Sequence, residues 1–171
     1  MKRFLLAIPL ALLVTAPAHA TTLLRLDGIG PLKLGMSLTD ATGTGWLTHS
    51  GHGCPLGGKP YPQDYKLTGA KAPAGVDGTA EFNGATHELD TLAFNKGVRT
   101  ATGVIVGRST TSAMVAAYRH AGFAASARYD NTFAGTFVSV RRRKGSRIVM
   151  MGFASKSKLE TIGIPTIPVC D

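Results

Sequence analysis

The longest apolar stretch of the chain lies near its beginning. Lys2 and Arg3 precede an apolar run over residues 4–14, and a motif of small residues that ends at Ala20 follows it. This order of basic, apolar and small residues is typical of a signal peptide, so we expect residues 1–20 to be removed by cleavage after Ala20. The run is shorter than the about 20 residues that cross a bilayer, and no other run approaches that length. The pattern therefore predicts no transmembrane segment.

Beyond this leader, two parts of the chain repeat the same order of apolar and polar positions. Residues 34–37 (Leu-Gly-Met-Ser) resemble residues 106–109 (Val-Gly-Arg-Ser), and residues 88–94 resemble residues 158–164. The members of each pair are about 70 residues apart, and the pairs occur in the same order, which indicates a duplicated module.

Each repeat is predicted to begin with a helix and to continue with strands. Ser37 and Ser109 stand where a hydroxyl can cap a helix by accepting a hydrogen bond from a backbone N–H. Asp40 nearly completes a capping box with Ser37, and Gly122 stands where a left-handed residue would end the second helix. The strand-like segments are 64–68, 79–83 and 87–94 in the first repeat, and 136–143, 147–153 and 158–164 in the second.

These elements predict an α+β protein made of two tandem modules. Each module is expected to pack a helical segment on a three- to four-stranded antiparallel sheet. The expected domains are a signal peptide over 1–20, a first repeat over 21–99 and a second repeat over 100–171. The first repeat contains a Gly/Pro-rich connection between residues 48 and 77, and a connection of that length is either functional or pinned.

The cysteines suggest how that connection is pinned. The chain has two, Cys54 and Cys170. An even number in an exported chain predicts a disulfide bond, because the compartments outside the cytoplasm are oxidising. The bond would tie the C-terminus to the first repeat, and closing so long a loop is worth roughly 4–5 kcal/mol by the loop-entropy argument.

Charge adds a preference for anionic partners. The chain has 19 Lys and Arg against 10 Asp and Glu, a formal net charge of +9. An exported protein of this charge meets acidic proteins or anionic envelope polymers more readily than nucleic acid. One run concentrates the charge: Arg141, Arg142, Arg143, Lys144 and Arg147. On a hairpin, alternation would place Arg141 and Arg143 on one face, and the run is either a solvated tip or a docking patch.

The order of strand, Gly-Met-Ser, helix and three antiparallel strands resembles the repeat of the β-lactamase inhibitor protein. It is also similar to the small outer-membrane lipoproteins that accompany the β-barrel assembly machinery, and above all to uncharacterised exported proteins of actinobacteria that carry a similar motif twice. Residues 34–37 carry the resemblance, and residues 106–109 carry it more weakly. It implies tandem repeats and, in the inhibitor, a concave sheet that faces an enzyme. No inhibitory contact residue can be placed on this chain.

Candidate catalytic and metal-binding residues are few. His49, His52 and Cys54 are ligand types for zinc or copper, but their spacing fits no common zinc pattern, so we interpret this segment as a solvated Gly-rich loop. The chain has no Gly-x-Ser-x-Gly nucleophile elbow and no phosphate loop that ends in Lys-Ser or Lys-Thr. Asp90 and Glu160 are isolated acids, and no carboxylate pair is predicted. No cofactor or metal is expected.

The sequence thus predicts a secreted or periplasmic, non-enzymatic binding or interaction protein of the cell envelope or extracellular space, with inhibitor-like binding as one form of it. Its expected partner is an acidic protein or an anionic envelope polymer. The alternative is a small secreted hydrolase or cell-wall-modifying enzyme whose site comes together only in the folded chain. A cleft with two or more convergent titratable groups would favour the enzyme, whereas a smooth sheet with charge at one hairpin would favour binding.

Overall fold

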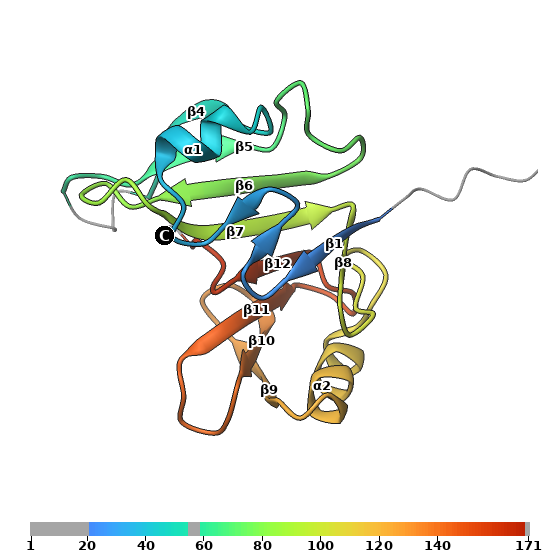
Figure 1. Cartoon of the computed structure of the whole chain (residues 1–171). Helices are drawn as coiled ribbons and strands as arrows, with labels where there is room; N and C mark the ends of the chain where they lie inside the picture. Colours follow the sequence, from blue (N-terminus) through green and yellow to red (C-terminus); the bar gives the residue numbers. More distant parts are fainter. Residues whose placement is uncertain (1–20, 55–58, 170–171) are drawn as a thin grey trace, which may run out of the picture.

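The protein is mostly β. A computed structural model describes residues 21–54 and 59–169, and this part of the chain forms twelve strands and two helices (Figure 1). Most strands belong to one eight-stranded antiparallel sheet, and the others form a four-stranded sheet. Neither helix in this part is long and apolar enough to cross a membrane.

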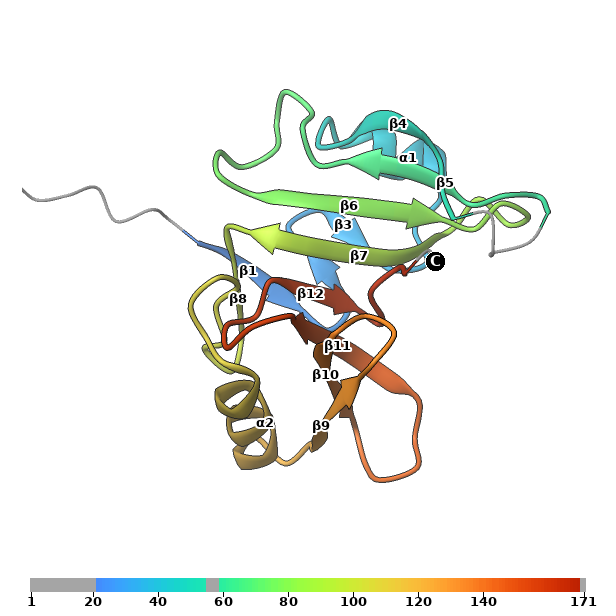
Figure 2. The same cartoon turned by 180° about the vertical axis from the view of Figure 1, so that it is seen from behind.

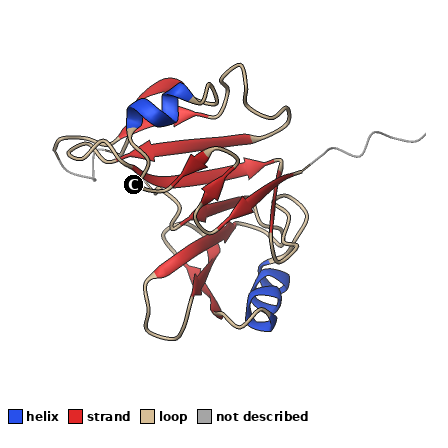
Figure 3. Ribbon diagram, viewed as in Figure 1, coloured by secondary structure: helices blue, strands red, loops and turns tan. Residues whose placement is uncertain are grey.

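The large sheet has the strand order β4-β5-β6-β7-β12-β11-β10-β9. Its strands are β4 (Thr48–His52), β5 (Gln63–Lys66), β6 (Asp77–Phe82), β7 (Leu89–Lys96), β9 (Ala124–Asp130), β10 (Gly135–Arg141), β11 (Ile148–Ala154) and β12 (Thr161–Ile164). The small sheet, in the order β3-β2-β1-β8, consists of β1 (Thr22–Arg25), β2 (Gly28–Ile29), β3 (Leu32–Lys33) and β8 (Val98–Thr100). The helices are α1 (Leu38–Gly43) and α2 (Thr111–His120) (Figure 3).

The prediction of an α+β protein made of two helix-on-sheet modules is wrong. The two halves share one sheet, because β7 pairs with β12 in a register that sets Phe94 opposite Ile162. The first half also lacks a substantial helix, since α1 has six residues and buries only Ala41. Only α2 packs as predicted, with Met114 and Tyr118 buried beneath it.

Two strands of the large sheet escaped prediction. These are β4 and β9, the strands at its two edges. Each half therefore contributes four strands to the large sheet, one more than the three strand-like segments identified in its sequence. No residue of β4 is buried and only Ala125 of β9 is, so neither strand shows the alternation of apolar and polar residues that reveals a half-buried strand.

The helix starts are partly as predicted. The Ser37 hydroxyl accepts from the Asp40 backbone N–H (3.1 Å) and donates to the Asp40 carboxylate (2.7 Å), which confirms the cap at Ser37. The predicted cap at Ser109 is wrong, because Thr110 accepts from the Ala113 N–H (3.1 Å). Ser109 instead accepts from the backbone N–H of Ile105 (2.9 Å). One extra residue between Gly107 and the helix causes this shift.

The segments that look alike in sequence make the same contacts in the fold. Gly35 and Gly107 both have φ of +79°, and their N–H groups donate to the carbonyls of Leu89 and Leu159, both at 2.8 Å. In return the N–H of Leu89 donates to Met36, and that of Leu159 donates to Ser109. These equivalent contacts follow from the internal similarity, whereas the repeat boundaries at residues 99 and 100 stay a prediction.

One face of the large sheet is covered and the other is largely open. Side chains from both sheets and both helices meet in one buried cluster that includes Leu24, Ala41, Phe94 and Met114. Figures 1 and 2 show the small sheet lying across β7 and β12 on one face of the large sheet. On the opposite face, the segment after β12 folds back over the sheet. A Cβ at Gly163 would lie only 2.0 Å from the Thr166 carbonyl oxygen. Two hollows among the described residues are lined by side chains of this face.

Candidate functional site

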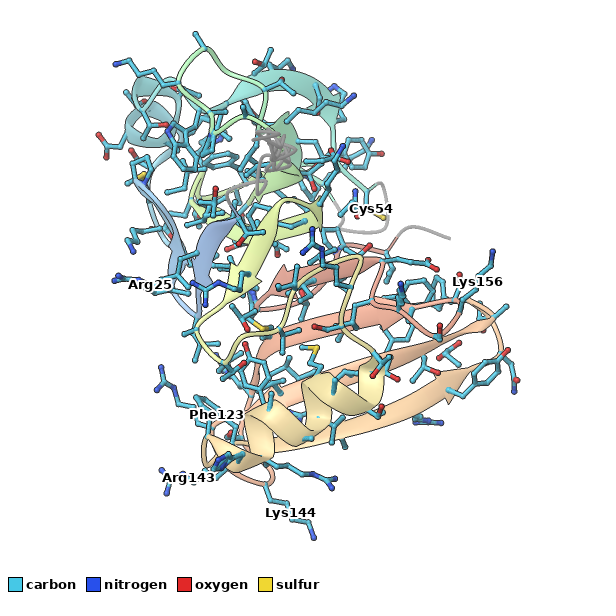
Figure 4. The ribbon with its side chains drawn as sticks, turned by 90° about the vertical axis from the view of Figure 1, so that its right-hand side faces the viewer. Arg25, Cys54, Phe123, Arg143, Lys144 and Lys156 are labelled. Carbon is cyan, nitrogen blue, oxygen red and sulfur yellow. The ribbon has the colours of Figure 1, made fainter. Side chains whose placement is uncertain are left out.

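The basic run lies in the β10–β11 hairpin. β10 ends at Arg141 and β11 begins at Ile148, so the other four basic residues of the run belong to the connecting loop, where all of them are exposed. The expected alternation of Arg141 and Arg143 on one strand face is wrong, because the pairing with β11 shifts at Arg141 and the strand ends there. Figure 4 shows Arg143 and Lys144 at this end of the molecule, near Phe123.

Arg141 differs from its neighbours in the run. Its side chain is half-buried, and its Nη1 atom donates to the backbone carbonyl of Ser146, which closes the loop. The same side chain lines two adjacent hollows on the surface. Arg141 therefore links the loop to the sheet. The charges of the loop lie at the rim of these hollows.

The two hollows combine basic groups with apolar walls. One, of about 440 Å³, lies between the end of α2 and the hairpin; its lining is Arg119, Phe123, Ala124, Ala125, Ser126, Arg141, Lys144 and Gly145. The other, of about 370 Å³, lies on the open face of β9 and β10; its lining is Ser126, Arg128, Asp130, Phe137, Ser139 and Arg141. We call them the basic hollows.

An aromatic row continues from the basic hollows across the open face. The rings of Phe133 and Phe137 lie 5.5 Å apart, and those of Phe137 and Phe153 lie 4.8 Å apart. Arg128 is the cross-strand neighbour of Phe137 on the other side. All three rings are half-buried, so they present apolar surface beside the cations.

The cations of the basic hollows have no carboxylate partner close by. Within residues 21–54 and 59–169, the only ion pair joins Lys33 to Asp27 at 3.3 Å, far along the chain. Asp130 shares a hollow with Arg128, but the two form no ion pair. The Nε atom of Arg119 donates a hydrogen bond to the Ala125 carbonyl (2.8 Å), so one N–H donor of this side chain already has a backbone partner. The charge of this region is thus available to an anionic partner.

Sequence reasoning missed Arg119 and Arg128. Arg119 lies at the end of a correctly predicted helix, and only the turn at Gly122 brings it beside β9. Arg128 lies on β9, a strand that was not predicted. Neither arginine adjoins another Lys or Arg in the sequence, so no local run of charge pointed to them.

The structure changes the interpretation of the segment that contains the two histidines. His49 and His52 lie on the edge strand β4, so the interpretation of this segment as a loop is wrong. The His49 ring packs edge-on against Tyr65 (4.9 Å), and the His52 ring contacts Tyr61 (6.3 Å). No three His, Cys, Asp or Glu side chains among those placed lie close enough to share an ion.

A carboxylate pair was missed on the open face of the first half. Asp64 and Glu81 are cross-strand neighbours on β5 and β6, and one oxygen of each lies about 3 Å (2.9 and 3.1 Å) from where a Cβ at Gly53 would stand. Burial raises the pKa of both, and for Glu81 the charges of Asp64 and Asp90 add to the effect. A hydrogen bond from the Cys54 backbone opposes that rise in the Glu81 pKa.

The raised pKa of Glu81 predicts how stability depends on pH. The folded protein favours the protonated form, so the contribution of Glu81 is present at low pH and is lost as pH rises through its folded pKa. Glu81→Gln should therefore have a higher thermal midpoint than wild type at pH 7, and the gap should close below the ordinary pKa of 4.5. The matched control is Glu88→Gln, which changes an exposed carboxylate. An equal gap at pH 7 and pH 4 would contradict this account.

The carboxylate pair lies under the C-terminal segment. Ile167, Pro168 and Cys54 line a hollow of about 290 Å³ together with the pair. The Cys54 Sγ atom is 3.8 Å from the carbonyl oxygen of Val169, the residue before Cys170. Cys170 lies outside the described residues, as does the leader over 1–20, so the Cys54–Cys170 bond and the cleavage after Ala20 stay predictions.

Known proteins offer no guide to this site. Comparison of the chain with family models, with curated proteins and with solved structures finds no match. The resemblance to the β-lactamase inhibitor protein, which rests on residues 34–37 and 106–109, therefore stays a prediction.

Proposed function

We propose that this protein is an exported, non-enzymatic binding protein that holds an acidic partner protein at its basic hollows. The observation that carries the proposal is the group formed by Arg119, Arg128 and Arg141, which lie beside exposed apolar surface without a carboxylate partner in the described chain. The predicted leader over residues 1–20 supports a place in the periplasm or outside the cell.

The apolar walls favour a protein over an anionic envelope polymer. A polyanion needs only charge, which the exposed loop over residues 142–147 offers by itself. Phe123 and Phe137 add apolar surface next to Arg141, and interfaces between proteins combine aromatic side chains and arginine in this way. An acidic protein with apolar side chains among its carboxylates would use both.

Charge reversal tests this proposal. The partner is first captured from envelope extract with wild-type protein and identified by mass spectrometry. Arg128→Glu combined with Arg143→Glu should then weaken binding of this partner by at least about tenfold. Neither side chain makes a hydrogen bond within the described protein, so the fold should survive. Binding by wild type should also weaken as salt is raised, because exposed charge pairs are screened.

The matched control reverses Lys156 and Lys158, which are exposed and line a separate hollow. Figure 4 shows Lys156 at a different end of the molecule from Arg143 and Lys144. It makes the same change in net charge and should retain binding. If both double variants lose binding equally, net charge and not the basic hollows holds the partner. If the Arg128 and Arg143 variant binds as wild type does, the proposal is wrong.

One observation favours a hydrolase as a second candidate. Asp64 and Glu81 are convergent titratable groups, and paired carboxylates perform acid–base chemistry in glycoside hydrolases. Against this, two apolar residues of the C-terminal segment, Ile167 and Pro168, line the same hollow as the pair. The Glu81→Gln variant separates the two roles: a catalytic Glu81 makes the variant unable to release sugars from cell wall that wild type degrades, whereas a structural one changes stability alone.

A further inference from the structure

The two edges of the large sheet differ in how open they are to another strand. β4 has five residues and its pairing with β5 shifts register between His49 and Gly51. Such a bulge twists an edge and protects it from pairing. β9 has seven residues, contains no proline, and pairs with β10 at every position from Ala124 to Asp130 without a shift. Of the two edges, β9 is therefore the longer and the more regular.

The outer side of β9 carries unpaired backbone groups. In an antiparallel pair, alternate residues direct both N–H and C=O towards the partner strand, and the others direct them away. The Ala125 carbonyl accepts from the Arg119 side chain (2.8 Å), so Ala125 belongs to the outward set. Alternation adds Ala127 and Tyr129 to that set. In the described chain no strand lies beyond β9, and residues 126–129 are all exposed.

The side chains next to this edge define what would bind there. Ser126, Arg128 and Asp130 project from β9 into one of the basic hollows, beside Phe137 and Ser139 of β10. A strand added to β9 would lie about 4.8 Å away, so its alternate side chains would extend over this hollow. Arg128 and Arg141 favour carboxylates at those positions, and only Asp130 opposes them.

We propose that β9 binds an extended acidic segment of the partner protein by strand addition. This inference rests on the proposed function and names its mode: backbone hydrogen bonds to Ala127 and Tyr129, with carboxylates of the segment facing Arg128 and Arg141. A second copy of this chain is a poorer occupant, because it would bring another basic surface against the first.

A synthetic peptide of about eight residues that alternates Glu and Val is the probe, with acidic side chains on one face and β-branched ones on the other. Ala127→Pro removes an N–H that points away from β10, so the sheet should keep its own hydrogen bonds. It should weaken peptide binding by at least about tenfold, whereas Ala127→Val, which keeps the N–H, should bind as wild type does.

Hydrogen exchange on the wild type gives a readout that needs no variant. Peptide binding should slow exchange at the amides of Ala127 and Tyr129 and leave those of Ser126 and Arg128 unchanged, since the latter already bond to β10. Uniform slowing, or none, would overturn strand addition. So would self-association of wild type through β9 in the absence of peptide, measured by sedimentation.

The experiment separates this inference from the function on which it rests. If Arg128→Glu with Arg143→Glu loses the peptide but Ala127→Pro keeps it, the basic hollows bind acidic chains without strand addition, and only the further inference fails. If wild type does not bind the peptide at all, strand addition fails, and the capture experiment decides the proposed function by itself.

Discussion

Replacing Cys54 with Ser is expected to lower the free energy of unfolding by about 2–5 kcal/mol, because it would remove the predicted bond to Cys170 and this is the usual cost of losing a disulfide from a small domain. Cys54 lies where the long connection of the first half meets the C-terminal segment, with its Sγ atom 3.8 Å from the Val169 carbonyl. A bond to Cys170 would hold Ile167 and Pro168 over the large sheet. Urea unfolding under non-reducing conditions measures the loss.

A double-mutant comparison isolates the bond itself. Cys54→Ser, Cys170→Ser and the double variant should all cost the same, because each removes the same link. Wild type in reductant should match them. Two free thiols in denatured, unreduced protein would contradict the prediction.

The local parts of the fold could be read from the sequence. A hydroxyl before a helix and a glycine after the last turn act over a few residues, so Ser37 and Gly122 perform as expected. Asp40 accepts from the Ser37 hydroxyl and not from its backbone N–H, so the predicted capping box does not form. The joining of the halves could not be read. The β-branched and apolar residues of β7 and β12 suit any central strand, and nothing in their sequence indicates which strand each of them pairs with.

The candidate site was predicted only in part, for a related reason. The charge of residues 141–147 is a local feature and was found. Arg119 and Arg128 join it only because an unpredicted strand, β9, lies between α2 and β10. Asp64 and Glu81 were missed because cross-strand pairing brings together residues that are far apart in the chain. The composition of a segment reveals its charge. Only the register of strand pairing decides which residues from distant segments come together.

The seam between β7 and β12 should make the chain unfold as a single unit. Ile162 is fully buried there, opposite Phe94. Ile162→Ala removes buried methyl and methylene groups and leaves a cavity, which should lower the free energy of unfolding by about 2–5 kcal/mol. Trp46, the one tryptophan, lies in the first half, where its ring packs close to Gly30. Its fluorescence therefore reports on the half that does not contain the substitution.

In one cooperative sheet, Ile162→Ala shifts the Trp46 transition by the same amount as the transition seen by far-ultraviolet circular dichroism. The control is Val169→Ala, which truncates an exposed side chain and should shift neither transition by more than about 0.5 kcal/mol. Two separate modules would behave differently: the Trp46 transition would stay at its wild-type midpoint while the circular dichroism transition split. That outcome would show that the β7–β12 pairing contributes little to the stability of the first half.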